Sequence, residues 1–184
     1  AHLGRAVGGV GQVVRSGMVV RPAVGRVRCF ERCVCSAAVL ERFVGRKRPR
    51  VALLNGGDEL VSPGTMPDSY QVIDINTAML AAATIEAGGV PVPIDTVGDD
   101  PAAVTRALEQ ACDTADIIVS TAGISMSRHD HIPDCVARLG AVDVRTVAMR
   151  PGKPLIVGRV GCTPFLGLPG NPVSSAVAFL LFAR

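Results

Sequence analysis

VPIDTVGDDPAAVTRALEQACDTADIIVS, residues 92–120, holds the pattern that decides the fold. The stretch Val92–Val97 predicts a strand, and Asp99-Asp100-Pro101 predicts the capped start of a helix. We expect this helix to run to about Cys112, and the fully apolar Ile117–Ser120 to form the next strand. A strand, a helix and a second strand in this order are typical of a parallel β-α-β unit.

The same alternation continues on both sides of this unit. We expect further strands over Val51–Leu54, Val142–Met149, Leu155–Val157 and Phe165–Leu168, and further helices over Asn76–Ala87, from near Asp130, and over Val173–Phe182. The chain is 48% hydrophobic but only 3% aromatic, so Val, Ala, Leu and Ile must fill the core, as in a buried parallel sheet. The sequence therefore predicts an α/β fold, a three-layer sandwich around a mostly parallel sheet.

The first part of the chain has a different character. Residues 1–48 show no sustained hydrophobic period, and residues 1–50 contain eleven Arg or Lys but only two acids. We interpret 1–48 as an irregular basic segment, or as the remnant of a neighbouring domain. The α/β domain is expected over 49–184, truncated at its C-terminal end.

Composition argues against several classes of function. Basic proteins that bind nucleic acid commonly interleave aromatic residues, which are scarce here, so we expect no nucleic-acid partner. The apolar run Ala176–Ala183 is far shorter than the roughly 20 residues that span a bilayer, so we expect no membrane association. The six cysteines lack a standard zinc spacing and are interpreted as unpaired thiols of a reducing compartment, which favours a cytoplasmic location.

Chemistry should lie at one edge of the predicted sheet. In open α/β sheets, ligands bind outside the carboxyl ends of the strands. The loops that follow Leu54, Val97, Ser120, Met149 and Leu168 are all polar or rich in glycine. We therefore expect these five loops to form the binding site.

Acidic residues occupy three of the segments near this edge. Asp58 and Glu59 form a carboxylate pair that could hold Mg²⁺ through oxygen atoms, or could simply lie on a surface turn. Asp74 and Asn76 flank the start of a helix, where capping explains them at least as well as ligand contact. Asp100 before a proline allows the same two interpretations.

The loop Ser120–Ser125 follows a buried strand directly. Its small residues let backbone N–H groups approach an anion, and its hydroxyl groups add further donors. Further along, Asp130 lies between His129 and His131. Such alternate spacing rarely closes a tetrahedral metal shell, so we expect these histidines to face solvent.

Two turns rich in proline and glycine give the strongest signal. The segment Arg150–Pro154 carries Arg150 and Lys153, and Lys153 is one of only two lysines in the chain. Arginine can bind two oxygens of phosphate or a similar oxyanion at once, and lysine adds a compact charge. The second turn, Gly167–Ser174, lies beyond a short apolar hairpin. Together the two turns predict a site for an anionic ligand.

Taken together, these loops resemble the molybdopterin-binding domain of the molybdopterin molybdenumtransferase family, which includes the C-terminal part of gephyrin-type proteins. The resemblance covers about residues 49–184, and its specific part is the tandem of Met149–Pro154 and Gly167–Ser174. Supporting matches are Gly57–Leu60, Asp74-x-Asn76, Gly98–Asp100, Ser120–Ser125 and Asp130. The resemblance implies an enzyme of molybdenum cofactor biosynthesis that inserts molybdate into adenylylated molybdopterin and releases AMP, assisted by Mg²⁺.

The resemblance also implies roles for individual residues. Asp58 and Glu59 would be metal ligands, while Asp100, Asp130, Arg150 and Lys153 would be catalytic, the acids toward Mg²⁺ or pyrophosphate and the cations toward molybdate or phosphate. The cradle for the pterin and its phosphate would consist of Ser120, Thr121, Gly123, Ser125, Pro169, Gly170, Asn171, Pro172 and Ser174. Members of the family are homodimers, so a homodimer is expected as well.

Some residues depart from the family pattern. Asn55 and Gly56 stand where Ser or Thr usually precedes Gly-Asp-Glu-Leu, and Thr121 and Ala122 stand where the third loop usually reads Ser-Gly-Gly. Two alternatives follow: a noncatalytic module that binds molybdopterin or acts as a scaffold, and a related enzyme that adenylylates molybdopterin. Ile124-Ser125 favours the metal-inserting branch over the adenylylating one.

Overall fold

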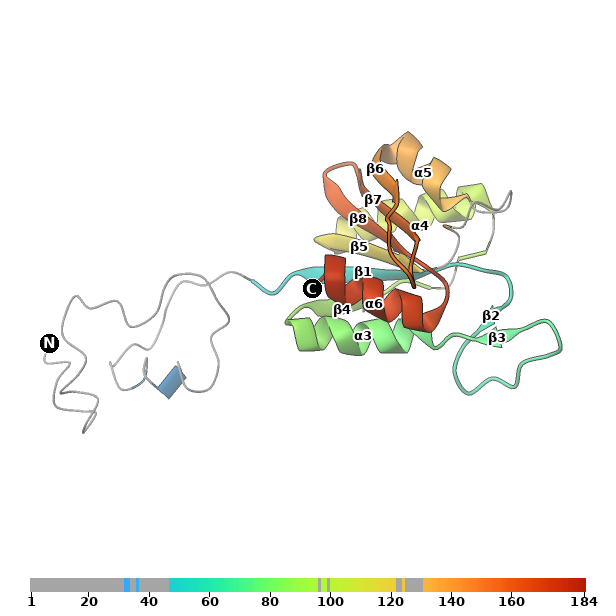
Figure 1. Ribbon diagram of the computed structural model, residues 1–184, viewed down its shortest axis with the longest axis horizontal. Coiled ribbons are helices and arrows are strands. Elements are labelled where there is room, and N and C mark those ends of the chain that lie inside the picture. The colour runs from blue at the N-terminus through green and yellow to red at the C-terminus, as the bar shows by residue number, and fades with distance from the viewer. Residues whose placement is uncertain are drawn as a thin grey trace, which may run out of the picture. The chain divides into compact units, whose positions relative to one another are not determined.

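The computed structural model describes residues 32–33, 36, 47–95, 97–98, 100–121, 124 and 131–184. The chain divides into two units, Ala1–Lys47 and Arg48–Arg184. The labelled elements of Figure 1 all belong to the second unit. The segment 1–48 lies almost entirely outside the described residues, so its irregular character stays a prediction.

A six-stranded sheet in the order β4-β1-β5-β8-β7-β6 forms the middle layer. Its strands are β1 (Arg50–Asn55), β4 (Val90–Pro93), β5 (Ile117–Thr121), β6 (Gly140–Thr146), β7 (Pro154–Val160) and β8 (Thr163–Leu168). Strands β4, β1, β5 and β8 run parallel, whereas β7 is antiparallel to both of its neighbours. Strand β6 therefore points the same way as β8. Every strand except β7 ends at one edge, which we call the carboxyl edge.

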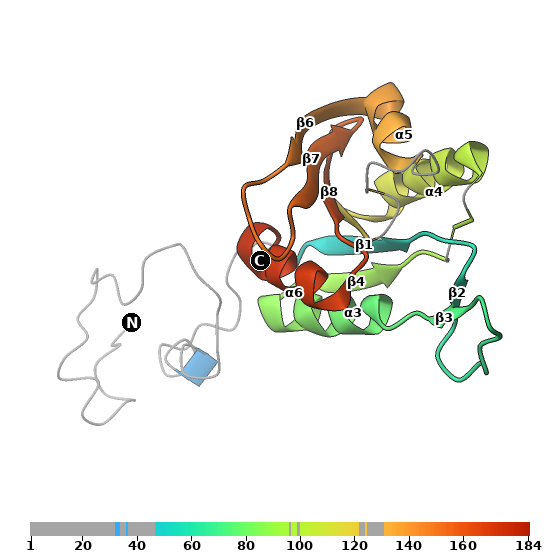
Figure 2. The ribbon, with the colours of Figure 1, turned by 45° about the vertical axis from the view of Figure 1, so that its right-hand side comes forward.

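Helices cover both faces of this sheet (Figures 1 and 2). Helices α3 (Asn76–Ala87) and α6 (Pro172–Phe182) lie on one face, and α4 (Pro101–Thr114) and α5 (Ile132–Leu139) on the other. Strand β1 feeds both cores by its alternation, because Ala52 and Leu54 pack toward α4 while Val51 and Leu53 pack toward α3 and α6. The predicted three-layer sandwich with a mostly parallel sheet is confirmed.

Two element boundaries differ from the sequence prediction. The strand expected over Val92–Val97 is β4, Val90–Pro93, and only an isolated bridge joins Val97 to Gly56. Strand β4 is at the end of the sheet, where prolines are tolerated because one side of the strand needs no ladder hydrogen bonds. The strand expected over Val142–Met149 is β6, which ends at Thr146 and leaves the last three positions to a loop.

The start of α3 also differs from the prediction. Asn76 is the first residue of the helix rather than its cap, and the preceding Ile75 has no side-chain cap bond. The Asp74 carboxylate instead accepts a hydrogen bond of 3.0 Å from the Thr77 backbone N–H. The predicted end is confirmed, because Gly88 adopts the left-handed conformation, with φ 99°, that closes a helix.

An excursion from the sheet, residues 57–75, was not predicted as ordered structure. It contains the short parallel strands β2 (Leu60–Val61) and β3 (Val72–Ile73), and we call it the β2–β3 arm. Met66 is 92% exposed and Tyr70 is 87% exposed at its tip. Near the end of the arm, the Asp74 backbone N–H donates a 2.8 Å hydrogen bond to the carbonyl of Val61.

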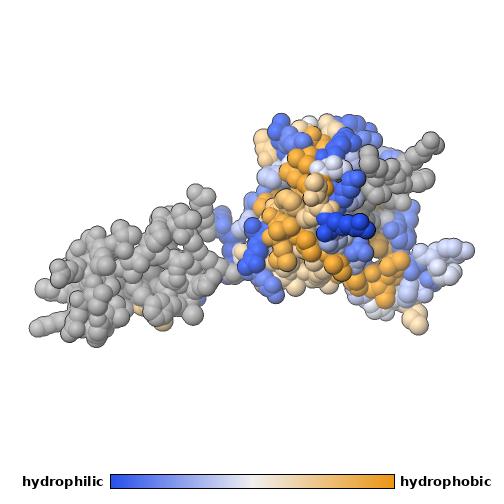
Figure 3. Space-filling model, viewed as in Figure 1, coloured by the Kyte–Doolittle hydropathy of each residue, from blue (hydrophilic) through white to orange (hydrophobic). Residues whose placement is uncertain are grey.

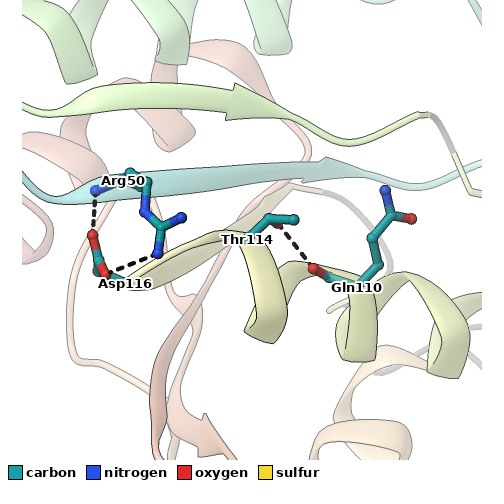
Figure 4. A network of polar contacts seen from close by, with 4 residues as sticks. All are labelled: Arg50, Gln110, Thr114 and Asp116. Carbon is teal, nitrogen blue, oxygen red and sulfur yellow. Dashed lines mark hydrogen bonds and ion pairs between the residues drawn. The ribbon is translucent and has the colours of Figure 1, made fainter.

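The amino ends of β1 and β5 are joined at the opposite edge of the sheet (Figure 4). Asp116 accepts a 2.7 Å hydrogen bond from the Arg50 backbone N–H and forms a 3.4 Å ion pair with its guanidinium. The Thr114 hydroxyl donates 2.9 Å to the carbonyl of Gln110 in the last turn of α4. The Arg50–Asp116 contacts thus join β1 to the start of β5 at the edge away from the predicted chemistry.

The surface carries apolar side chains over the C-terminal part of α6, which Figure 3 shows as orange. Leu180, Leu181 and Phe182 are all at least 46% exposed there. No helix within the described part of the chain is both long and apolar enough to cross a bilayer. The expected cytoplasmic location stays a prediction.

Candidate functional site at the carboxyl edge

The ends of the parallel strands are aligned at the carboxyl edge. Asn55 at the end of β1 pairs in register with Thr121 at the end of β5, and Thr121 pairs with Leu168 at the end of β8. The loop from β6 to β7 begins at this same edge, because β6 runs parallel to β8. The loops that follow β1, β5, β6 and β8 therefore start at the same edge of the sheet, as the sequence predicted.

Buried polar side chains gather at this edge. Among the described residues, the buried polar set consists of Asn55, Asp74, Asn76, Thr84, Ser120, Thr121, Ser174 and Ser175. All except Thr84, which lies near the end of α3, occur where a strand ends or a helix begins at the carboxyl edge. We call these seven residues the polar edge cluster. Burying polar groups costs free energy unless they are hydrogen-bonded, so a cluster of this size is typical of a binding site.

Asn55 lies at the centre of the polar edge cluster and is only 2% exposed. The Thr121 hydroxyl donates a 2.6 Å hydrogen bond to the Asn55 side-chain oxygen Oδ1. The Asn55 amide nitrogen Nδ2 has no partner of normal hydrogen-bond geometry, although the Asn55 side chain helps to lower the pKa of Asp74. Asn55 thus lies between Thr121 and Asp74.

Asp74 is a buried carboxylate that stays ionised. Its burial raises its pKa, but the polar groups of the Thr77 side chain and backbone, the Asn55 side chain and the Asn76 backbone together lower that pKa below the ordinary value of 3.8. This accounts for a charged group at the edge of the core. It also means that the negative charge of Asp74 is held in place by neighbouring dipoles.

The turn between β8 and α6 is joined to α3. The Asn76 amide donates 2.9 Å to the carbonyl of Gly170, and its Oδ1 has no partner. Asn171 caps α6, accepting hydrogen bonds of 3.1 and 3.3 Å from the backbone N–H groups of Val173 and Ser174. Pro172 occupies the first turn of the helix, where proline is favoured. The predicted binding residues Pro169–Pro172 therefore lie in a fixed turn.

Arg150 and Lys153 line one hollow. It has a volume of about 670 Å³ and is formed by the segment Val147–Pro154 together with Ser174. Both cationic residues are exposed, and the bond from Val147 N–H to the Lys153 carbonyl, 3.0 Å, closes the base of the loop. Gly152 has φ 106°, a conformation that favours glycine. The predicted pair of cations thus faces the start of α6, as an anion site at the second turn requires.

The predicted metal ligands Asp58 and Glu59 lie in the loop after β1, and both are exposed. The Asp58 carboxylate lies against Gly98, where an added Cβ would come within 2.6 Å of its oxygen. The Glu59 carboxylate folds back over Gly57, which has φ 137°. The loops after β1 and after β4 are therefore neighbours. Within the part of the chain that the structure describes, no three His, Cys, Asp or Glu side chains form a metal-binding group.

Asp100 caps α4. Its carboxylate accepts hydrogen bonds of 3.3 and 3.0 Å from the backbone N–H groups of Ala102 and Ala103. This confirms the capping interpretation, and Pro101 follows at the first helical position. The catalytic role that the resemblance implied for Asp100 stays a prediction.

Three predicted residues, Gly123, Ser125 and Asp130, lie outside the described residues, so their place in the site stays a prediction. Conversely, Asn55 and Ser175 belong to the polar edge cluster but were not predicted as site residues. For Asn55 a signal existed, because a polar residue directly ends an otherwise apolar strand. Ser175 offered no signal, since it follows Ser174 in a largely apolar helix.

Known proteins are similar to this chain in sequence and in fold. The chain is 34% identical over 174 residues to "Molybdopterin molybdenumtransferase" of Nostoc sp., an alignment that covers 92% of this chain and 40% of that protein. It is 36% identical over 181 residues to "Molybdopterin molybdenumtransferase 2" of Mycobacterium tuberculosis, covering 94% and 42% respectively. The chain thus spans about two fifths of the length of these curated relatives.

A solved structure of a molybdopterin biosynthesis protein has a similar fold. "The Crystal Structure of molybdopterin biosynthesis moea protein from Pyrococcus horikosii" superposes with a TM-score of 0.77 at 30% identity, over 86% of this chain and 39% of that one. The family described as "Probable molybdopterin binding domain" matches residues 52–184, which contain every residue of the two cores except Val51. The chain therefore belongs to this family of molybdopterin-binding domains.

Proposed function

We propose that this chain acts in molybdenum cofactor biosynthesis as the molybdopterin-binding part of a molybdopterin molybdenumtransferase. The reaction would cleave adenylylated molybdopterin, insert molybdate into its dithiolene and release AMP. One observation carries the proposal: Arg150 and Lys153 share a hollow with Ser174, next to a turn that is joined to the polar edge cluster. A ligand with an anionic end and a polar heterocyclic end suits such an arrangement.

The two cations would act on negative charge. When water cleaves the phosphoanhydride, the new P–O bond forms as the bond to AMP breaks, and negative charge develops on the phosphate oxygens. Fixed cations beside that charge stabilise the transition state more than the ground state. Arg150 would bind two oxygens at once, and Lys153 would place a compact charge on phosphate or molybdate.

The two loops would hold the rest of the substrate. Ser120, Thr121, Gly123 and Ser125 would offer hydroxyl and backbone donors on one side of the pterin and its phosphate. The turn Pro169–Pro172 and Ser174 would form the other side, at the amino end of α6, where the helix dipole favours an anion.

Asp58 and Glu59 would supply only part of the coordination shell of Mg²⁺. Proteins usually hold this ion through one or two carboxylates together with substrate phosphates, so Asp58 and Glu59 are a sufficient protein contribution. Bound there, Mg²⁺ would neutralise charge on the pyrophosphate. Asp100 and Asp130 would then support the same pyrophosphate region, as the resemblance implies.

AMP release tests the proposal. We expect the protein, mixed with adenylylated molybdopterin, molybdate and Mg²⁺, to release AMP, and Lys153→Ala to lower the rate by about 100-fold, as losing one electrostatic donor does in other enzymes. Lys47→Ala is a matched control, because Lys47 is the only other lysine and is exposed. Equal rates for both variants would contradict the role of Lys153, and no AMP from the unmodified protein would contradict the enzymatic proposal.

A second candidate is a binding module without turnover. It is favoured by Thr121 and Ala122, which stand where the third loop of the family usually reads Ser-Gly-Gly. Binding of molybdopterin without AMP release would support this candidate. A homodimer remains part of the first proposal, and the exposed Leu180, Leu181 and Phe182 supply apolar surface of the kind that dimer interfaces bury.

A further inference from the structure

Another hollow lies at the edge of the sheet where β1 and β5 begin, opposite the carboxyl edge. It has a volume of about 110 Å³ and is formed between the sheet and the C-terminal ends of α3 and α6. Its walls include Val51 from β1, Val119 from β5 and Phe179 from α6. These three side chains belong to the core on this face of the sheet and are at most 7% exposed. The hollow is therefore a small apolar recess in that core.

Thr84 of α3 brings a buried polar group to this hollow. Among the described residues that line it, only Thr84 and Arg184 have polar side chains, and Arg184 is exposed. Thr84 is 1% exposed, yet its hydroxyl has no hydrogen-bond partner. Burying a hydroxyl without a partner costs free energy, so this group calls for a specific explanation.

The backbone of α3 does not satisfy the Thr84 hydroxyl. In α4, the hydroxyls of Thr105 and Thr114 donate hydrogen bonds of 2.8 and 2.9 Å to the carbonyls four residues earlier. Thr84 makes no such bond. Its methyl group lies against Gly89, where an added Cβ would come within 2.9 Å of it. Because Thr84 lines the hollow, its hydroxyl is available to a molecule bound there.

Size and polarity together select the kind of molecule that suits the hollow. A buried water typically needs two to four polar partners, whereas the described walls offer one buried side-chain hydroxyl. An apolar cavity of about 150 Å³ can bind benzene, so this slightly smaller hollow suits a molecule of about five non-hydrogen atoms. A charged group would be costly to bury beside a single hydroxyl. A neutral hydroxyl can both donate and accept, as the Thr84 hydroxyl can.

We propose that this hollow is a binding site for a small neutral alcohol. The hydroxyl of the alcohol bonds to Thr84, and its apolar chain packs against the walls from β1, β5 and α6. The inference does not depend on the proposed function, because the hollow lies at the opposite edge of the sheet from Arg150 and Lys153.

NMR spectroscopy of the full chain with butan-1-ol, an alcohol of this size, tests the site. We expect saturable binding, with nuclear Overhauser effects from the alcohol to the methyl groups of Val51 and Val119. Thr84→Val keeps the shape of the side chain but removes the hydroxyl. We expect it to raise the Kd for butan-1-ol about fivefold, which corresponds to the net loss of one hydrogen bond. Thr114→Val makes the same substitution in α4, on the other face of the sheet, and should leave the Kd unchanged.

Thr84→Ser is the conservative counterpart of Thr84→Val. It keeps a hydroxyl and removes only a methyl group, so we expect a Kd within about twofold of that of the unmodified protein. Equal Kd values for the unmodified protein and Thr84→Val would overturn the role of Thr84. An absence of Overhauser effects to Val51 and Val119 would overturn the site itself, with water only in the hollow. If Thr84→Val does not fold, Overhauser effects from the alcohol to the Thr84 methyl group decide, and their absence would contradict the proposal.

Discussion

At the scale of single residues, the positions of charged residues in the sequence predicted the cationic part of the site, but not which buried side chains lie near one another. Arg150 and Lys153 stood out because the second cation is one of two lysines, and both line the same hollow. The influence of Asn55 on Asp74 was not predicted, because it depends on how β1 and the β2–β3 arm come together in space. The Asp74 carboxylate was interpreted as a helix cap, and it is also a buried group whose pKa the Asn55 side chain helps to lower.

The lowered pKa of Asp74 predicts a pH dependence of stability. A carboxyl group whose folded pKa lies below its ordinary value of 3.8 stabilises the fold at all pH values above 3.8. This contribution is lost as the pH falls through the folded pKa. We expect Asp74→Asn to cost about 2 kcal/mol at pH 7, as for hydrogen bonds to a charged group, and less near pH 2.

Urea unfolding at the two pH values measures this difference. Asp113→Asn, a change at an exposed residue on α4, is the control and should give a small difference at both pH values. A cost of Asp74→Asn that is the same at pH 7 and near pH 2 would show that the Asp74 charge is not stabilised by the fold.

At the scale of elements, helices were easier to predict than strand limits. The start of α4 was clear because Asp100 and Pro101 leave little freedom, and its end at Thr114 lies two residues beyond the prediction. Strand β4 was placed too late, because an edge strand tolerates prolines that would disrupt a central one. The β2–β3 arm was missed because strands of two residues leave no periodicity to detect.

The two roles of Asp100 can be separated by substitution. Asp100→Ala should lower the free energy of unfolding by about 1 kcal/mol, because the N–H groups of Ala102 and Ala103 lose their cap. Asp100→Asn should keep most of that stability, since asparagine caps as well as aspartate. If Asp100 also serves the pyrophosphate, as proposed, then Asp100→Asn should still slow AMP release.

Denaturant unfolding and AMP release, measured on both variants, show whether Asp100 acts only as a helix cap or also in the reaction. An Asp100→Asn protein with normal stability and a normal rate would restrict Asp100 to capping. Asn171→Asp, an equivalent change at the cap of α6, shows how far exchanging these two side chains perturbs a cap in this fold.

At the scale of the whole molecule, alternation of strands and helices was enough to predict the layers. Two apolar cores, one on each face of the sheet, follow from the period of two in β1 and from the apolar side chains of the helices on each face. What could not be predicted is which strands are neighbours, because the order β4-β1-β5-β8-β7-β6 depends on contacts distant in sequence. The layered fold could therefore be predicted from the hydrophobic pattern. The contacts among buried site residues could not, because they depend on the order of the strands in the sheet.

Both cores lie within Val51–Ala183, which predicts that residues 48–184 fold without the preceding segment. We expect this shortened chain to keep a single cooperative urea transition with the same midpoint as the full chain. A matched chain that ends at Leu168 should fail to fold cooperatively, because it lacks Ala178 and Phe179 of α6 and exposes the core beside β8. Circular dichroism during urea titration measures the unfolding of both shortened chains. A lower midpoint for 48–184 would show that residues before Arg48 contribute to the stability of the α/β unit.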